Sequence, residues 1–511
     1  MKRFFNLLSR FIVILPALVL QILWVLLPLF FVVEFAPLVF LISAAVSLIV
    51  ICIIPTKRGD TTYKFLWVIA IVIFPILGTM LYITCGDKRT SAPLSRRIRK
   101  NSINFSEILP KNSNSEVENT RSYQTLQLVA SLSGSQITQS SFAKYYSCGE
   151  DMQPDMLLEL SKAKHSIFIE YFIIENGVFL DSIIEILKQK VAENVDVRIL
   201  YDDIGSISTF NRKNKRNLEK LGIKCCRFNP LHFVKFSLNN RDHKKMMIID
   251  NQVCFSGGIN IADEYINQKQ RFGYWKDIGF QIRGKSVMTY TQMFTQFWNA
   301  YAKQKITKNM LFLPDFDQKS AKNDDFLSKN SDSTTISYYD SPSNKEPISN
   351  KFFVDAVSQA NKYVYFYTPY LILDNILRET LISAAQRGVD VRIIIPGIPD
   401  KKIVYFLSRR EAEELSKFGI KVYIYHRGFS HAKALIVDDE ICSIGSVNLD
   451  YRSMFLNFEN NTIFYHSPIL QDLKSDFLTT QNQSKIIVLD NKKHFFKNFL
   501  CLILSPFAPF F

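Results

Sequence analysis

Cysteine pairs of the kind that bind metal ions or form structural disulfides are missing from this sequence. Its eight cysteines include no CxxC pair and no other metal-ligand spacing. Cys225 and Cys226 are adjacent, which is a poor geometry for an ordinary disulfide. These absences exclude the common cysteine-based zinc sites, and we expect reduced thiols in apolar surroundings.

Acidic residues are also scarce. The chain has 47 Asp and Glu against 62 Lys and Arg, a formal net charge of +15. This balance favours an acidic partner, either nucleic acid or anionic lipid, and charge alone does not choose between them. With 47% apolar and 21% charged residues over 511 positions, the composition indicates two or more globular domains with an added membrane part.

Charge is absent from three long runs near the start of the chain. Residues 11–33, 38–54 and 65–83 are apolar and uncharged, and a membrane-spanning helix needs about 20 such residues. We expect residues 1–90 to form a multi-pass transmembrane region, in a cell membrane. The first run is too long for the apolar part of a signal peptide. Basic residues divide evenly between the two sides, so they do not decide the orientation.

Three further segments differ from the rest in composition. Residues 91–144 and 313–348 are polar, and we expect a connector and a linker there. The carboxyl end, 491–511, is apolar but too short and too rich in proline to span a membrane. We interpret it as an interfacial tail.

The remaining sequence contains an internal duplication. Residues 161–200 and 358–394 each hold a β-rich run, a helical stretch and a second strand with the tetrapeptide VDVR. Alternating strands and helices predict βαβ units on a mostly parallel sheet. We therefore expect two similar α/β domains with mostly parallel or mixed sheets, at 145–312 and 349–490.

Each repeat ends with the same motif. The pattern HxKxxxxD, then six residues, then G[GS]xN occurs at 243–260 and again at 431–448. Two copies with identical offsets are very improbable by chance. The candidate residues are His243, Lys245, Asp250 and Asn260 in the first copy, and His431, Lys433, Asp438 and Asn448 in the second.

The spacing has a chemical meaning. Alternate residues of a strand share a face, so the histidine and lysine of each motif point the same way. A phosphodiester site needs a nucleophile, an acid for the leaving oxygen, and positive charge on the other oxygens. Two His, two Lys and two Asn provide all of these without a metal or another cofactor. Lysine is not an expected metal ligand, so neither motif predicts a metal site.

The duplicated motifs resemble the phospholipase D superfamily over about residues 145–490. A narrower resemblance is to the bacterial cardiolipin synthases. It rests on GGIN, DEY and YWKD between 257 and 277, on TPY at 368–370, and on GSVNLDYRS at 445–453 with Asn457 and Glu459. Lys276 stands where that family often has Arg, and the run 11–33 is an additional leading segment.

The resemblance implies two phospholipase D-type domains packed as a pseudo-dimer behind transmembrane helices. It also implies phosphatidyl transfer between two phosphatidylglycerol molecules through a phosphohistidine, at a membrane bilayer and without nucleic acid. By family analogy His243 is the nucleophile and His431 the acid/base, and the near-symmetry of the motifs leaves the reverse assignment open. Lys245, Lys433 and the two asparagines would hold phosphate oxygens.

The acidic residues have separate expected roles. Asp277 and Glu459 are candidates for orienting the two histidines. Asp250 and Asp438 complete the catalytic motifs, and we expect them to make structural ion pairs rather than to contact phosphorus.

Three other functions fit part of the pattern. A hydrolytic phospholipase D or a headgroup-exchange enzyme would use the same phosphohistidine with another acceptor. A nuclease would use the same residues on DNA or RNA, and the basic charge would suit it, but the apolar runs argue against it. A non-catalytic scaffold would tolerate loss of motif residues, and none is lost.

Overall fold

The fold is described from a computed structural model. It describes residues 36–57, 61–86, 92–103, 105, 120–230, 239–314 and 332–488, together with positions 19 and 22. Nearly all of the predicted span 11–33 and all of the tail 491–511 lie outside the described residues.

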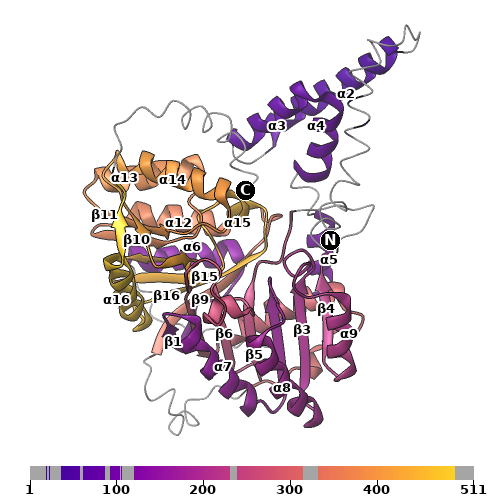
Figure 1. Ribbon diagram of the computed structural model, residues 1–511, viewed down its shortest axis with the longest axis vertical. Helices are drawn as coiled ribbons and strands as arrows, with labels where there is room; N and C mark the ends of the chain where they lie inside the picture. The colour runs from indigo at the N-terminus through magenta and orange to yellow at the C-terminus, as the bar shows by residue number, and fades with distance from the viewer. Residues whose placement is uncertain are drawn as a thin grey trace.

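Within the described residues, fifteen strands form one continuous sheet. The first half contributes, from the centre outward, β1 (Thr138–Tyr146), β8 (Gly279–Gly284), β6 (Val253–Gly257), β5 (Lys245–Ile249), β2 (Ser166–Tyr171), β3 (Asp196–Asp202) and β4 (Lys224–Phe228). The second half repeats this order with β9 (Asp332–Asp340), β16 (Glu459–Tyr465), β15 (Ile441–Gly445), β14 (Ala434–Val437), β10 (Tyr363–Tyr367), β11 (Asp390–Pro396) and β12 (Lys421–Tyr425), and adds β17 (Ser484–Ile486) at the edge. Because β1 and β9 pair with each other, the halves meet at the centre of a single sheet (Figure 1).

The α/β class and the two similar halves agree with the sequence analysis, and of the two expected sheet types the observed one is mixed rather than mostly parallel. Only β2–β3–β4 and β10–β11–β12 are parallel, which gives four parallel pairs against ten antiparallel pairs. The reason lies in the motifs themselves. Asp250 and Asn251 turn the chain with positive φ (50° and 54°), so β5 and β6 form a hairpin instead of a crossover. Asp438 and Asp439 do the same between β14 and β15.

Helices cover the sheet in both halves. The first half has α7 (Gly149–Lys162), α8 (Val178–Ala192), α9 (Arg212–Lys220) and α10 (Val287–Tyr301), with short 3-10 turns at Asp263–Ile266 and Lys308–Met310. The second half has α12 (Ile348–Gln359), α13 (Asn375–Gln386), α14 (Lys402–Ser416), α15 (Tyr451–Phe455) and α16 (Ile469–Asn482). One buried apolar cluster includes residues of both halves, among them Phe280 and Phe464, whose rings meet edge to face at 5.2 Å. The two halves therefore share a core as well as a sheet.

The segments expected to be connectors contain regular structure. Helices α5 (Ala92–Lys100) and α6 (Arg121–Ser133), and the start of β1, fall within 91–144. Strand β9 falls within the expected linker 313–348 and lies next to the sheet centre. Its polar sequence DSTTISYYD is typical of a linker, so the strand was not expected. Ser and Thr are accommodated on a central strand because they form hydrogen bonds across the sheet, as Ser337 does with Thr462.

The amino-terminal helices are α2 (Ala36–Thr56), α3 (Thr61–Ile73) and α4 (Pro75–Leu81), followed by a short π-helix at Tyr82–Gly86. The predicted span 65–83 is not one helix, because Pro75 begins a new helix and its ring cannot continue α3. Gly78 then lies so close to α3 that an added Cβ would be 2.4 Å from the Ala70 carbonyl oxygen. No helix among the described residues has both the length and the apolar character needed to cross a membrane.

These helices pack against the second half of the chain, as Figure 1 shows. The ring of Tyr63 stacks on that of Tyr451 in α15, with centroids 5.0 Å apart. Tyr63 and Trp67 belong to the same buried cluster as Phe455. The opposite face of α3 is apolar and open, with Phe65 62% exposed. One face of this helical group is thus part of the protein core.

Tyr63 and Phe65 allow a matched test of this packing. We expect Tyr63→Ala to lower the free energy of unfolding by about 3 kcal/mol, since it removes a buried aromatic ring. Phe65→Ala, two residues away on the open face, should change it by less than about 0.5 kcal/mol. Thermal unfolding in detergent measures both, and equal shifts for the two variants would contradict the packing.

Candidate active site

The two motif histidines lie where the halves of the chain meet. The backbone amide of His243 donates to the carbonyl of Phe458 in the second half (2.8 Å). In the same way, the amide of His431 donates to the carbonyl of Lys276 in the first half (2.7 Å). The latter contact extends a small parallel pair of strands, β7 (Tyr274–Lys276) and β13 (Gly428–Ser430). Each histidine is therefore fixed by backbone of the opposite half.

Their side chains follow the same crossed pattern. His243 Nδ1 is hydrogen-bonded to Glu459 (2.8 Å), and His431 Nδ1 to Asp277 (2.7 Å). Both carboxyl groups are fully buried. An ionised carboxylate only accepts hydrogen bonds, so Nδ1 carries the hydrogen and Nε2 is left as the reactive nitrogen. The sequence indicated the two acids but not that each one serves the histidine of the other half.

Each acid is itself held in place. Glu459 accepts a hydrogen bond from the Ser446 hydroxyl (2.5 Å), and Asp277 accepts one from the Ile278 amide (2.9 Å). Gly258 occupies the position that corresponds to Ser446, and a Cβ there would lie 2.1 Å from the Asp277 carboxylate. The G[GS] part of the motif thus either makes room for the acid or hydrogen-bonds it.

The two lysines complete a buried cluster. Lys245 Nζ donates to the His243 carbonyl (2.5 Å), and Lys433 makes the same contact with His431. Burial lowers the pKa of Lys245 to about 7 and that of Lys433 to about 8. Burial also raises the pKa of Asp277 to about 7, against the attraction of Lys433.

Charge is balanced across the cluster. Burial raises the pKa of Glu459 to about 7, and Lys245 opposes that rise. Two ammonium groups and two carboxylates sum to zero, which makes their joint burial tolerable. Burial, and after it the two lysines, hold the pKa of His243 and His431 well below the usual value. Both imidazoles are therefore neutral near pH 7, and a neutral Nε2 can act as a nucleophile.

Asp250 and Asp438 have a different place from the one expected. The Asp250 carboxylate accepts hydrogen bonds from the backbone amides of residues 164–166 (2.7–2.8 Å), and that of Asp438 from residues 361–363 (2.7–2.9 Å). Among the described residues neither carboxylate forms an ion pair, and backbone amides take the place of the expected charged partners. A carboxylate on a left-handed turn can accept hydrogen bonds from several successive backbone amides. Each aspartate thereby ties its hairpin to the start of β2 or β10.

The two asparagines differ from each other. Asn260 donates to the Tyr265 hydroxyl (2.7 Å) and accepts from the Ile173 amide (3.1 Å). The buried Asn448 amide oxygen has no hydrogen-bond partner among the described residues. These contacts use one of the two amide hydrogens of Asn260 and leave the other available. Phosphate binding by either asparagine stays a prediction.

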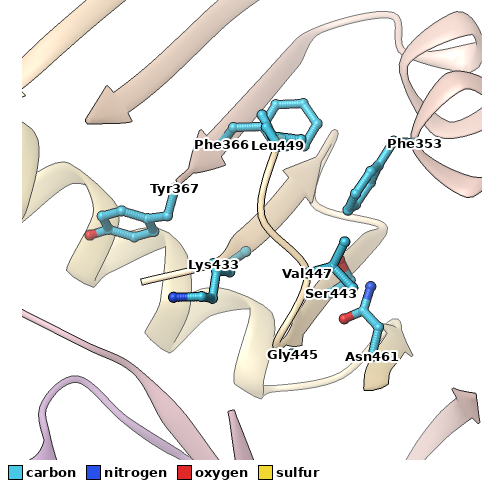
Figure 2. A pocket seen from close by; sticks show the side chains of 10 residues that line it. Phe353, Phe366, Tyr367, Lys433, Ser443, Gly445, Val447, Leu449 and Asn461 are labelled. Atoms are coloured by element: carbon cyan, nitrogen blue, oxygen red, sulfur yellow. The ribbon is translucent and has the colours of Figure 1, made fainter. Parts of the chain in front are cut away.

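Apolar packing fixes the direction of Lys433. A cavity of only about 10 Å³, room for roughly one water, lies behind it and is lined by Phe353, Phe366 and Val447, among others. Figure 2 shows the Lys433 ammonium pointing away from Phe353 and Val447. With aromatic and aliphatic groups behind it, the ammonium is directed toward the histidines.

Aromatic rings enclose His431 more than His243. Tyr265, Trp275 and Phe429 have ring centroids 5.4, 5.5 and 5.8 Å from that of His431. His243 meets the edge of Phe172 at 4.7 Å. Tyr265 and Trp275 belong to the quoted family pattern, whereas no sequence signal distinguished Phe172 or Phe429 from core residues.

Comparisons with known proteins identify the domain family and the fold. The family model described as cardiolipin synthase, PLD-like domain matches residues 156–298 and 353–480, and one described as phospholipase D-nuclease N-terminal matches 40–86. A crystal structure of phosphatidylserine synthase from Haemophilus influenzae has the same fold, with a TM-score of 0.56 at 16% identity over 75% of this chain and 98% of that one.

Similar sequences extend over nearly the whole chain. An uncharacterized protein of Streptococcus mutans is 38% identical over 89% of this chain and 97% of its own length. Cardiolipin synthases of Halalkalibacterium halodurans and Alkalihalophilus pseudofirmus are each 32% identical, over 91% and 86% of this chain and 93% and 87% of their own lengths. The chain therefore belongs to the phospholipase D superfamily, in the family of cardiolipin synthase-like proteins with two PLD domains.

Proposed function

We propose that this protein is a membrane-anchored cardiolipin synthase that transfers a phosphatidyl group from one phosphatidylglycerol to another and releases glycerol. The observation that carries the proposal is the paired site, in which two imidazoles backed by acids lie with two buried lysines. The names of the two relatives at 32% identity support the choice of lipid.

In the first step, Nε2 of His243 attacks the phosphorus of the donor lipid. A P–N bond forms and the P–O bond to glycerol breaks, while His431 gives its Nε2 proton to the departing glycerol oxygen. His431 is neutral in the empty site, and the negative charge of a bound phosphodiester favours its protonation. Lys245 and Lys433 offset charge on the non-bridging oxygens, and Asn260 and Asn448 are proposed as further donors.

In the second step, His431 is the base. It removes the proton from a hydroxyl of the second phosphatidylglycerol, whose oxygen attacks phosphorus as the P–N bond breaks. Cardiolipin leaves and both histidines return to their initial state. Glu459 and Asp277 keep the two Nδ1–H groups oriented throughout and stabilise whichever imidazolium forms.

The remaining parts are proposed to bring this site to its lipid. Residues 1–90 would anchor the chain in the cell membrane, with the exposed apolar face of α3 toward lipid. Residues 145–312 and 349–490 would form the two catalytic domains, and 491–511 would rest at the interface.

An assay in phosphatidylglycerol micelles tests the proposal directly. We expect the purified protein to release glycerol and form cardiolipin in equal amounts, because each transfer yields one of each. Both products are quantified from the same sample. Glycerol with phosphatidic acid and no cardiolipin would make the protein a hydrolase instead.

The two histidines should fail at different stages. We expect His243→Ala and His431→Ala each to lower turnover by 10³-fold or more, on the order seen when a paired catalytic group is removed. In His431→Ala the phosphatidyl-enzyme should form slowly, because the departing glycerol lacks its acid, and should then persist, because its breakdown needs a base, whereas His243→Ala should carry no label. Mass spectrometry of enzyme treated with labelled phosphatidylglycerol distinguishes them, and label on His431 of the His243→Ala variant would reverse the roles.

The buried lysines predict an alkaline limit. A lysine whose pKa is lowered to about 7 or 8 loses its charge as pH rises through that value. We therefore expect kcat/KM to fall above about pH 8, since the free enzyme then lacks a cation for phosphate. The alkaline fall in kcat should occur at higher pH than the fall in kcat/KM, because bound phosphate raises the lysine pKa. A kcat/KM that stays constant to pH 10 would contradict the proposed role of the lysines.

A further inference from the structure

Lys401 is a positively charged residue near the site that only the second half of the chain supplies. Lys401 ends the loop that follows β11, immediately before α14, and its side chain is exposed. Its ammonium lies 4.9 Å from the ring centroid of Tyr370. The Tyr370 hydroxyl donates to Asp400 (2.5 Å), which fixes the loop. No carboxylate among the described residues lies within ion-pair distance of the Lys401 ammonium.

Lys401 lies near both histidines. Burial, then Lys245 and Lys433, lower the pKa of His243, and Lys401 adds to that effect. Lys401 contributes to the lowered pKa of His431 as well. Aromatic contacts also lead from Lys401 to His431: the Tyr370 ring under the Lys401 ammonium has its centroid 6.4 Å from that of Phe429, which lies 5.8 Å from that of His431. Because Lys401 is exposed and the histidines are buried, Lys401 lies on the solvent side of the site, which we call its entrance.

The corresponding loop of the first half lacks this charge. Lys401 comes five residues after the end of β11 at Pro396, and Ile207 comes five residues after the end of β3 at Asp202. Ile207 is apolar and 38% exposed. The two halves therefore share the buried pair Lys245 and Lys433 but differ in the cation at the entrance.

Transfer between two identical lipids also requires an asymmetric site, because one lipid acts as the donor and the other as the acceptor. In the proposed reaction the transferred phosphate is held by the two lysines of the pseudo-symmetric centre. The acceptor brings a second phosphate, separated from the attacking hydroxyl by the three carbons of its glycerol. That second negative charge must come close to the first, on the side from which the acceptor enters. A cation there lowers the repulsion and places the hydroxyl.

We propose that Lys401 binds the phosphate of the acceptor phospholipid and so selects an anionic acceptor over a neutral alcohol. This site rests on the proposed function, since it serves only the second half of the transfer. The Tyr370 ring holds the Lys401 ammonium by a cation–π contact, and Asp400 holds the Tyr370 hydroxyl. The donor lipid requires no contact with Lys401.

Two reactions that start from the same donor distinguish acceptor binding by Lys401 from a general change in activity. Phosphatidylglycerol can pass its phosphatidyl group to a second phosphatidylglycerol, giving cardiolipin, or to isotopically labelled glycerol, giving labelled phosphatidylglycerol. Both use the same first step, and only the first acceptor carries a phosphate. Measured at one pH, their ratio also cancels any change in histidine pKa.

We expect Lys401→Gln to lower the ratio of cardiolipin formation to glycerol exchange roughly tenfold, as for loss of one charge-assisted contact to phosphate. Lys401→Arg should restore most of the ratio. Lys402→Gln is the matched control, with the same loss of charge one residue later on an exposed position, and should leave the ratio as in the wild type.

The other outcomes are distinct. If Lys401→Gln forms cardiolipin with the wild-type ratio, or if both reactions fall equally, the acceptor site is wrong and the proposed function stands. If the wild type exchanges labelled glycerol but makes no cardiolipin, the proposed function fails and the acceptor site fails with it.

Discussion

Two crossed hydrogen bonds determine how this protein must be built. His243 is oriented by Glu459, and His431 by Asp277, so each half of the chain supplies the acid for the other half's histidine. Neither half contains a complete site. The joined sheet and the shared apolar cluster can be understood from this requirement, because a hydrogen bond across the boundary keeps its geometry only if the halves cannot move relative to each other.

Charge compensation is the second condition of the same site. Two lysines and two carboxylates are buried together, and each would be costly to bury alone. Burial, and after it the two lysines, keep the histidines neutral. In the proposed reaction an anionic phosphate enters this charge-balanced centre, and Lys401 adds a positive charge on the side of the second half.

The sequence predicted which motif residues come together better than it predicted the topology. Each HxKxxxxD motif identifies its histidine and lysine by spacing alone, and the structure brings both copies together. The sequence did not decide between a mostly parallel and a mixed sheet, because a left-handed turn at Asp250 cannot be recognised in an apolar pattern. The polar strand β9 resembled a linker for a similar reason, since its hydrogen-bond partners lie far away in sequence. No local pattern could show that Glu459 serves His243, because that pairing exists only after the halves have joined.

The crossed pairing can be tested by measuring how fast labelled phosphatidylglycerol modifies His243 in the His431→Ala background, where the phosphatidyl-enzyme forms slowly without its acid and persists without its base. Adding Glu459→Gln should slow this labelling on the order of a hundredfold, because it removes the charge behind the attacking imidazole. Adding Asp277→Asn should have a much smaller effect, since its partner His431 is already gone. Slower labelling with Asp277→Asn but not with Glu459→Gln would mean that each acid serves the histidine of its own half, and would contradict the account.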